Sequence, residues 1–397
     1  MSTDLTTGVS PARVAFYNDP KIRNVIYQLV LCAIIASLVY GATVNAIDHL
    51  RRAHIASGFG FWDNTAGFDI SQTLIFYSSQ ASTYGRAFWV GLLNTLLVAG
   101  FGIVFATVLG FTIGISRLSK NWLLAKFATG YVETIRNIPL LLQLLFWYNA
   151  VLKALPDLRN SVVIFGGAYL NNRGLFLPEP VFLAGFGAVI VALIVGVLAA
   201  VAFYVWARKR QERTGQQAPV FWITLGLVIG LPLLVLALKG FPLRFEYTQA
   251  GRFNISGGLE VLPEFAALLF GLSIYTAAFI AEVVRAGIMA VSRGQTEAAY
   301  SLGLKPRPTL RLVVVPQAMR VILPPLTSQY LNLTKNSTLA VAIGYPDLVQ
   351  VFTGTVLNQT GQAIEVVAIT MLVYLAISLV TSFAMNIYNR RVALVER

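Results

Sequence analysis

The apolar residues of this chain gather into long uncharged runs instead of alternating with polar residues at helical or strand spacing. A transmembrane helix needs roughly 20 consecutive apolar residues, and five of the six longest runs exceed that length. The sixth run is shorter but continues beyond Glu282 through two valines. The pattern therefore predicts membrane-spanning helices at 24–47, 87–116, 180–207, 214–238, 265–281 and 366–389.

Two further segments are long and apolar enough to span a membrane but contain charged residues. The first runs from 127 to 152 and includes Glu133 and Arg136. The second runs from 320 to 345 and includes Lys335. Together with the uncharged runs, these segments predict an all-α integral membrane protein with about eight transmembrane helices.

The composition also indicates a membrane protein. Of the 397 residues, 56% are hydrophobic and only 12% are charged, whereas soluble domains contain roughly 25% charged residues. This composition excludes an ordinary cytoplasmic enzyme and a disordered protein. The segments 53–86 and 153–180 are rich in glycine, asparagine, proline and aromatic residues, so we expect them to lie on the membrane surface as caps rather than to form a separate domain.

The basic residues indicate the topology. Lys and Arg outnumber Asp and Glu by 30 to 17, which gives a formal net charge of +13. With eight spans, 19 basic residues lie on the side of the N-terminus, 9 lie on the opposite side, and Arg136 and Lys335 lie within spans. Because cytoplasmic loops carry the excess of Lys and Arg, both termini are predicted to be cytoplasmic. Topology explains the positive charge, and no nucleic-acid partner is expected.

The sequence contains none of the common motifs of catalysis or metal binding. Cys32 is the only cysteine, and the two histidines, His49 and His54, have no set of companion ligands. The chain lacks the G-x-x-x-x-G-K-[ST] loop that binds ATP phosphates, and it lacks the H-E-x-x-H and G-x-S-x-G motifs. We therefore expect a transport protein that is not an enzyme, with no catalytic residue, no metal site and no cofactor of its own.

The longest loop on the predicted cytoplasmic side carries the most specific pattern. Ser292 and Gln295 have the spacing of a capping box that begins a helix, and Gly303 can adopt the left-handed conformation that ends one. Pro308 suits the first position of a following helix. The loop is therefore predicted to form two short helices joined by a sharp turn, with a flat alanine face that a groove on a partner can hold.

The same loop fits the pattern E-A-A-x3-G-x9-I-x-L-P, with valines at the I and L positions. In this respect the chain resembles the permease subunits of ATP-binding cassette (ABC) importers. The resemblance implies that the loop docks onto a separate ATPase, whereas a merely solvated loop is the plainer alternative. The implied docking residues are Glu297, Ala298, Ala299, Gly303 and Pro316.

Four other stretches are similar to the polar amino-acid uptake branch of these permeases. They lie at 91–96, 131–144, 281–288 and 294–299. The resemblance implies a type I importer permease that also has an extra N-terminal helix and an inserted helix pair, a layout that looks like the general L-amino-acid permeases. The implied organisation is a tail, helix and outer loop at 1–86, a permease domain at 87–389 (core 87–152 and 265–389, insertion 153–264) and a cytoplasmic tail at 390–397.

Partners and substrate also follow from the resemblance alone. It implies an L-amino-acid importer of the cell inner membrane, supplied by a periplasmic amino-acid-binding protein. ATP and Mg²⁺ would bind to two separate ATP-binding subunits, because this chain has no phosphate-binding loop. A second permease subunit, a related but different chain, is expected to face this one across the translocation path.

Polar residues within the spans are candidates for contact with the substrate, because ionisable groups in a bilayer normally face a partner or a water-filled path. An amino-acid zwitterion needs a cation for its carboxylate and acceptors for its ammonium group. The alternatives are a Glu133–Arg136 ion pair within one helix and hydrogen bonds between helices. The branch often has Lys-Asp where this chain has Lys335-Asn336. The candidates for the substrate path are Glu133, Arg136, Asn137, Gln143, Asn332, Lys335 and Asn336.

Other residues in the spans are expected to be structural. Glu282 and Arg285 have the i, i+3 spacing of an ion pair within a helix. Two G-x-x-x-G pairs, at 110/114 and 226/230, are expected to let helices pack closely. The rival functions for such a chain are an ion-coupled secondary transporter, a membrane enzyme and a scaffold. A secondary transporter usually shows internal repeats, and none is visible in this sequence.

Overall fold

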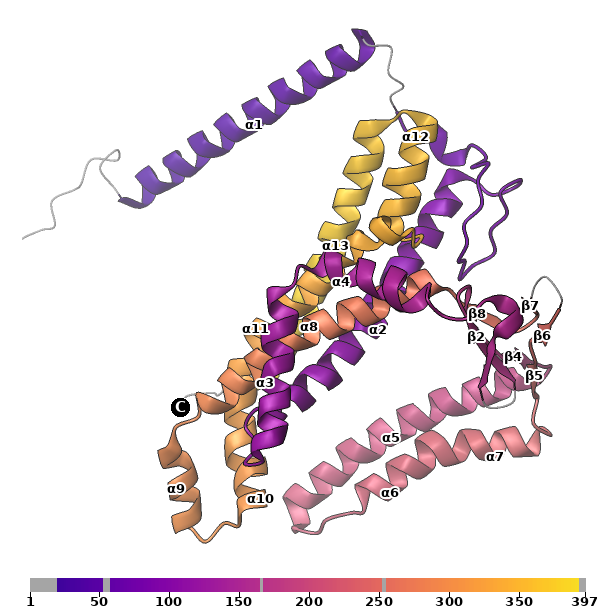
Figure 1. Cartoon of the computed structure of the whole chain (residues 1–397). Helices are drawn as coiled ribbons and strands as arrows, with labels where there is room; N and C mark the ends of the chain where they lie inside the picture. The colour runs from indigo at the N-terminus through magenta and orange to yellow at the C-terminus, as the bar shows by residue number, and fades with distance from the viewer. Residues whose placement is uncertain (1–19, 53–57, 165–166, 252–254, 393–397) are drawn as a thin grey trace, which may run out of the picture.

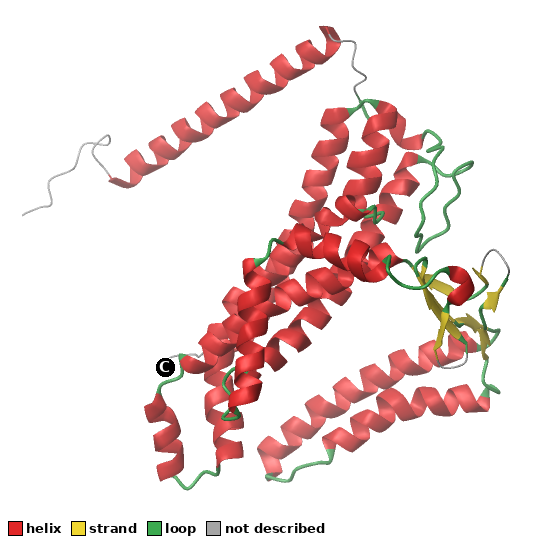
Figure 2. Ribbon diagram, viewed as in Figure 1, coloured by secondary structure: helices red, strands yellow, loops and turns green. Residues whose placement is uncertain are grey.

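The computed structural model of the protein describes residues 20–52, 58–164, 167–251 and 255–392. Helices form most of this part of the chain, and strands are confined to one corner (Figures 1 and 2). Seven helices in the described residues are long and apolar enough to cross a membrane, or eight when one bent pair is counted as a single span. This result agrees with the predicted number of about eight.

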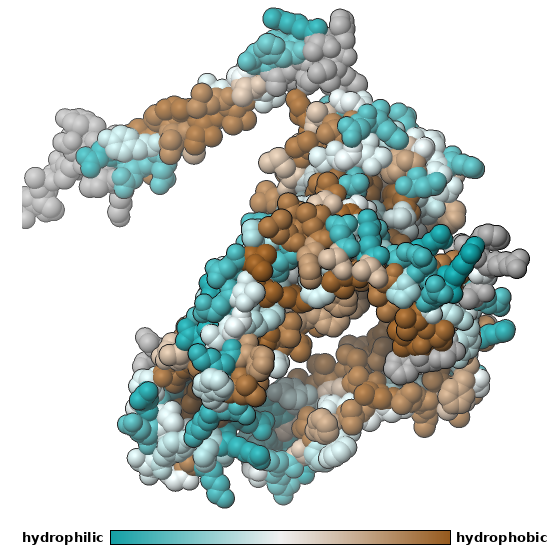
Figure 3. Space-filling view, in the orientation of Figure 1, coloured by the Kyte–Doolittle hydropathy of each residue, from teal (hydrophilic) through white to brown (hydrophobic). Residues whose placement is uncertain are grey.

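The first helix, α1, spans Pro20–Arg52, and its apolar part runs over Arg23–Asn45. Its described side chains are exposed along the whole length, and Figure 1 shows it apart from the other helices. In Figure 3, hydrophobic side chains cover the middle of α1 and hydrophilic ones lie toward its ends. This arrangement suits a helix whose neighbours are lipids.

A compact bundle forms the centre of the molecule, and α2 and α8 pack together at its core. Small residues permit this close approach: a methyl group added at Gly110 would lie 2.6 Å from the Ile280 side chain, and one at Gly114 would lie 2.7 Å from the Ala281 carbonyl oxygen. The packing role predicted for this glycine pair is confirmed. The main helices of the bundle are α2 (Tyr84–Ser116), α3 (Trp122–Asn137), α4 (Leu140–Leu145), α8 (Pro263–Met289), α11 (Val315–Asn336) and α13 (Ala363–Val392).

Shorter helical segments complete the bundle. The turns η2 (Gly60–Asp63) and η4 (Leu158–Asn160) lie in loops, and α9 (Arg293–Ser301) and α10 (Pro306–Thr309) form the loop between α8 and α11. The remaining segments extend or connect the long helices. They are η3 (Phe146–Leu152), η6 (Leu310–Val314), η7 (Ser337–Ile343), η8 (Val349–Val356) and α12 (Leu357–Thr360).

The predicted span at 127–152 is sharply bent. Its two halves, Trp122–Asn137 and Leu140–Leu152, meet at an angle of 106°. The residue before a proline is disfavoured in the helical conformation, and Ile138, before Pro139, is extended (φ −100°, ψ 128°). The break therefore follows directly from the proline.

The insertion between α4 and α8 folds as a helical hairpin that stands beside the bundle (Figure 1). Its helices are α5 (Phe186–Thr214), α6 (Val220–Leu225), η5 (Gly226–Gly230) and α7 (Leu231–Leu238). The close approach in this hairpin occurs at Gly196, where an added methyl group would lie 2.1 Å from the Leu227 carbonyl oxygen. Gly226 and Gly230 have open space around them, so the packing role predicted for this second pair is wrong.

Short strands cover the base of the hairpin. One sheet has the order β1-β2-β3-β8, and two smaller sheets pair β4 with β5 and β6 with β7. These strands refine the predicted surface cap at 153–180, which the sequence did not resolve into strands. Their bounds are β1 Val162–Ile164, β2 Ala168–Asn171, β3 Gly174–Leu177, β4 Glu179–Phe182, β5 Leu243–Glu246, β6 Gln249–Ala250, β7 Ile255–Ser256 and β8 Leu259–Val261.

Candidate functional site

The loop that carries the E-A-A pattern folds as the predicted pair of short helices at one end of the bundle, which we call the loop end (Figure 1). Gly303 is left-handed (φ 78°), and its N–H donates to the Tyr300 carbonyl oxygen (2.9 Å). The N–H of Leu304 donates to the Ala299 carbonyl oxygen (3.1 Å). These two bonds satisfy carbonyl groups at the end of α9, as the predicted C-terminal glycine requires.

Two local details differ from the prediction. Ser292 precedes α9, but its side chain makes no capping hydrogen bond, and only its carbonyl oxygen accepts from the N–H of Gln295 (3.1 Å). The second helix begins at Pro306 rather than Pro308. Either proline satisfies the preference for this residue in the first helical turn, so the sequence alone does not select between them.

The predicted docking residues fall into two groups. Glu297 and Ala298 are exposed on α9, while Ala299 is buried against the protein. Pro316 lies in the first turn of α11 and is half-buried. The side-chain amide of Gln317 on α11 donates to the Gln295 side-chain oxygen (3.2 Å). This hydrogen bond connects α9 to the start of α11.

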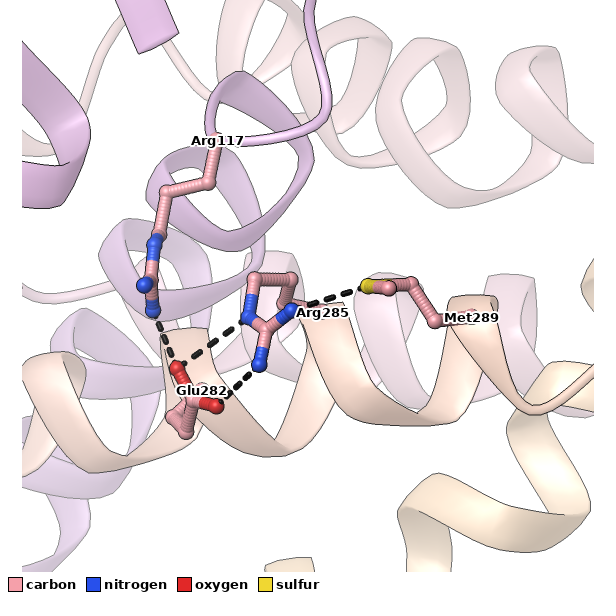
Figure 4. Close-up of polar contacts among 4 residues, drawn as sticks. All are labelled: Arg117, Glu282, Arg285 and Met289. Carbon is pink, nitrogen blue, oxygen red and sulfur yellow. Dashed lines mark hydrogen bonds and ion pairs between the residues drawn. The ribbon is translucent and has the colours of Figure 1, made fainter. Parts of the chain in front are cut away.

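Next to the loop, one carboxylate joins two arginines (Figure 4). On α8, the Arg285 Nη2 donates to the Glu282 Oε1 (2.6 Å), which confirms the predicted ion pair within the helix. The Glu282 Oε2 also accepts from Arg117, the residue directly after α2. Arg285 further contacts the sulfur of Met289. We name Arg117, Glu282 and Arg285 the loop-end triad, and it ties α2 to α8 immediately before α9.

The sequence did not predict the part played by Arg117. Its one signal is that Arg117 is the first charge after the uncharged run that forms α2. The partner on α8 is 165 residues away, so only the parallel packing of α2 and α8 brings the two charges together.

The seven residues proposed for the substrate path do not form one connected cluster. Among the residues described, the one hydrogen bond between two of the seven runs from the Asn137 side chain to the Glu133 carbonyl oxygen (2.7 Å). Glu133 and Arg136 form no ion pair with each other in this part of the chain, and the Arg136 guanidinium lies over the Phe279 ring, 5.1 Å from its centroid. The alternative interpretation, an ion pair between these two residues within the helix, is therefore not supported in the described residues.

The remaining candidates divide into structural and exposed residues. Gln143 is buried, and its side-chain amide donates to the carbonyl oxygens of Ile135 and Ile138 (2.9 Å each). It satisfies backbone groups that the break before Pro139 leaves unpaired, which is a structural role. Asn332 and Lys335 are exposed on α11, and Asn336 is half-buried at its end.

The opposite end of the bundle, which we call the cap end, holds a buried polar cluster. Asn94 on α2 donates from its side-chain amide to the carbonyl oxygens of Gln72 and Pro346 (2.9 Å each). The Tyr345 hydroxyl donates to the Asn94 carbonyl oxygen (3.2 Å), and the Leu348 N–H donates to the Thr95 hydroxyl (3.0 Å). We name Asn94, Thr95, Tyr345 and Asp347 the cap-end cluster.

Asp347 is the one charged member of the cap-end cluster. Its carboxylate accepts from the Gln350 N–H (2.8 Å) and from the Tyr374 hydroxyl (3.4 Å). Burial raises the pKa of Asp347 to about 7, and these hydrogen bonds only partly oppose the rise. No member of this cluster was predicted from the sequence as a site residue, although Asn94 and Thr95 lie in one of the stretches similar to the amino-acid permeases.

Comparisons with known proteins agree with this architecture. The family described as "Binding-protein-dependent transport system inner membrane component" matches residues 213–394. The general L-amino acid transport system permease AapQ of Rhizobium johnstonii is 54% identical over 97% of this chain and 96% of that protein. The putative amino-acid ABC transporter permease YhdX of Escherichia coli is 53% identical over 96% of this chain and 97% of that one.

A third relative is more distant. The glutamate/glutamine/aspartate/asparagine transport system permease BztB of Rhodobacter capsulatus is 42% identical over 96% of each chain. These matches cover nearly the whole chain, including the N-terminal helix and the inserted hairpin. This chain therefore belongs to the family of binding-protein-dependent ABC transporter permeases. It is a multi-pass inner-membrane protein and a transport subunit.

Proposed function

We propose that this chain is the permease subunit through which an ATP-driven importer carries L-amino acids across the inner membrane. The observation that carries the proposal is its identity of 54% to a general L-amino acid permease along nearly the full length. In this proposal both termini are cytoplasmic, the loop end faces the cytoplasm, and the cap end faces a periplasmic amino-acid-binding protein. A related second permease would complete the path.

Energy would come from two separate ATP-binding subunits that hold ATP and Mg²⁺, because this chain has no phosphate-binding loop. The exposed face of α9, with Glu297 and Ala298, suits a shallow groove on such a subunit. Closure of the ATPases would push α9, and the short connections to α8 and α11 would pass the movement into the bundle. The loop-end triad would carry it on to α2.

Reconstitution tests the proposed energy source. The complex purified through a tag on this chain is expected to contain a P-loop ATPase. In proteoliposomes, uptake of L-amino acids should require the binding protein outside and ATP with Mg²⁺ on the side of the ATPase. Uptake that continues without ATP and is abolished by an uncoupler would instead establish an ion-coupled secondary transporter and refute the proposal.

Two cationic residues on different helices support the second part of the proposal, a substrate path that includes Arg136 and Lys335. Neither forms an ion pair in the part of the chain that the structure describes, so each is free to bind a substrate carboxylate. Arg136→Ala and Lys335→Ala are expected to lower uptake about tenfold or more, because a charge-assisted hydrogen bond is lost. Lys126→Ala, at an exposed position on the same helix as Arg136, is the matched control.

The readout for these variants is the initial rate of uptake at equal amounts of inserted protein. The other residues proposed for the path are Glu133, Asn137, Gln143, Asn332 and Asn336, and of these Gln143→Ala is expected to act through stability instead. Rates for Arg136→Ala and Lys335→Ala that equal the Lys126→Ala rate for acidic, neutral and basic amino acids would remove both residues from the path.

A further inference from the structure

A polar hollow of about 370 Å³ lies at the cap end, between the start of α8 and the strands of the insertion. Figure 1 places β2 and β8 beside this end of α8. Its volume falls within the range of small-molecule sites, roughly 300–1,000 Å³. It lies outside the proposed substrate path. The side chains and backbone that matter for its chemistry are Tyr148, Lys153, Asn172, Arg173, Glu264 and Gly344.

The acidic side of the hollow is held in place by a hydrogen bond. The Tyr148 hydroxyl donates to the Glu264 Oε1 (2.7 Å), which leaves Oε2 of this carboxylate available to a ligand. Glu264 lies in the first turn of α8 and is half-buried. The ammonium group of Lys153 lies over the Tyr148 ring, 4.4 Å from its centroid. One tyrosine thus orients both a carboxylate and a cation at this hollow.

The second cation stands on a tight turn. Asn171 pairs with Gly174, so Asn172 and Arg173 form the turn between β2 and β3. The Asn172 N–H donates to the Pro156 carbonyl oxygen (2.9 Å), and the Asn172 side chain donates to the Asp157 carboxylate (2.9 Å). This double attachment fixes the backbone that carries Arg173, while the guanidinium itself is exposed.

The lining of the hollow carries more positive than negative charge. Neither Lys153 nor Arg173 forms an ion pair in this part of the chain. Glu260 lines an adjoining hollow; burial and the nearby Glu264 raise the pKa of its carboxyl, whereas Arg173 lowers it. The lining therefore offers two cations and one fixed carboxylate.

We propose that this hollow binds an amino acid on the periplasmic side before it enters the membrane path, with Glu264 binding the ammonium group and Lys153 and Arg173 binding carboxylates. The proposal rests on the proposed function and deepens it. Because the lining has two cations and one carboxylate, we expect it to bind acidic amino acids, which carry a second carboxylate, more tightly than neutral amino acids. Basic amino acids should bind least tightly. Lys153, Asn172 and Arg173 all belong to the insertion, which would thereby contribute to substrate selection.

Binding of labelled amino acids to the whole purified complex, without the binding protein, tests this site directly. The variants are Arg173→Gln, Lys153→Gln and Glu264→Gln, and the control is Arg159→Gln, an exposed arginine in η4 of the same insertion that does not line the hollow. A scintillation proximity assay gives the dissociation constants for L-aspartate, L-alanine and L-arginine. Thermal unfolding of each variant checks that the fold is retained.

The three variants have different expected signatures. Arg173→Gln and Lys153→Gln should each weaken L-aspartate binding about tenfold, the effect of one lost charge-assisted bond, and weaken L-alanine binding less. Glu264→Gln should weaken both to a similar extent, because both amino acids present an ammonium group. Arg159→Gln should match the wild type.

Two results would overturn the proposal. One is unchanged amino-acid binding in all three variants. The other is unchanged amino-acid binding together with weaker binding of the periplasmic protein to the complex, measured by surface plasmon resonance, because the hollow would then be a protein-docking surface. The proposed function is tested apart from this, since its failure appears as a loss of ATP-dependent uptake in the wild-type complex itself.

Discussion

The loop end and the cap end of the bundle are joined by different kinds of contact. At the loop end, the carboxylate of Glu282 bridges Arg117 and Arg285; the Glu282 and Arg285 side chains are 28% and 29% exposed, and the Arg117 side chain is 10% exposed. At the cap end, Asn94 and Asp347 are fully buried, and most of their hydrogen bonds go to backbone groups. The first contact is ionic and partly exposed, and the second is largely neutral and buried.

The difference between an ionic, partly exposed contact and a buried, largely neutral one indicates that the two ends differ in how readily they open. A buried hydrogen bond that is broken leaves an unsatisfied group, at a cost of about 1–3 kcal/mol, so the cap end resists local opening. A partly exposed ion pair can separate into water at a cost of about 0–1 kcal/mol. The loop end can therefore change its geometry when α9 moves, while the cap-end cluster keeps the loop at 344–350 fixed to α2.

The largest expected effect is on transport and arises at the loop end. Gly303→Asp is expected to lower ATP-driven uptake more than tenfold while the protein still inserts, because a side chain at φ 78° distorts the turn that presents α9. Glu297→Lys should do the same by reversing the charge on the proposed docking face. The measurement is uptake into proteoliposomes at equal amounts of inserted chain.

A matched variant at the other end separates docking from backbone strain. Gly361 is also left-handed (φ 69°) with open space around it, but it lies at the cap end, after α12. Gly361→Asp introduces similar strain and is expected to leave uptake close to that of the wild type. Equal losses in both variants would show that strain alone, and not contact with an ATPase, explains the effect at Gly303.

Features that depend on neighbouring residues could be predicted from the sequence, and features that depend on distant contacts could not. The apolar runs predicted the membrane spans, and Gly303 predicted the turn between α9 and α10, because each of these features depends on residues close together in the sequence. The contact of Asn94 with Pro346 joins residues 252 positions apart, and that of Arg117 with Glu282 joins residues 165 apart. No spacing rule connects such residues before the helices are packed.

The sequence did not predict the strands of the insertion, because they are short and depend on contacts outside each strand. β2 and β3 contain four residues each, too few to show an alternating pattern. Their pairing closes over only two turn residues, one of which is Arg173. The hollow that includes Arg173 and Glu264 exists only because this turn meets the start of α8, so the sequence alone did not bring the two residues together.

The largest expected loss of stability lies at the cap end. Asn94→Ala removes two hydrogen bonds and leaves the carbonyl oxygens of Gln72 and Pro346 without that donor. The free energy of unfolding is expected to fall by about 3 kcal/mol. Asn358→Ala is the control, because Asn358 is exposed and, among the described residues, its side chain binds only the local Gly354 carbonyl oxygen. Thermal unfolding of the purified protein in detergent measures both, and equal changes would contradict the importance of burial.

The raised pKa of Asp347 leads us to expect a smaller effect at the same end, a pH dependence of the free energy of unfolding. Its pKa of about 7 lies above the ordinary value of 3.8, so the folded state holds the proton more tightly than the unfolded state does. Stability from this group is therefore fully present below about pH 4, is lost as the pH rises toward 7, and changes little above that. Asp347→Asn is expected to remove this loss. Between pH 5 and pH 8, the free energy of unfolding of the variant should therefore gain about 2 kcal/mol on that of the wild type.

Unfolding temperatures at pH 5 and pH 8 test this sign. In the variant, the amide oxygen can still accept from the Gln350 N–H, and the amide NH2 can donate to the Tyr374 hydroxyl oxygen, so the fold should be retained. A wild-type protein whose stability rises between pH 5 and pH 8, with no such rise in Asp347→Asn, would reverse the assignment and place an ionised, stabilising carboxylate at the cap end.

The smallest expected effect returns to the loop end. Glu282→Gln keeps one oxygen that can accept from the nearly buried Arg117, and the partial exposure of Arg285 lets water solvate the charge that is released there. We therefore expect a loss of only about 1 kcal/mol, and this loss should shrink further in high salt, which screens the wild-type ion pairs. Glu212→Gln, which removes the fully exposed pair with Arg208, is the control and should change nothing measurable. A salt-independent loss as large as that of Asn94→Ala would mean that the triad is a rigid structural element like the cap-end cluster, and the loop end would then have to transmit movement without opening.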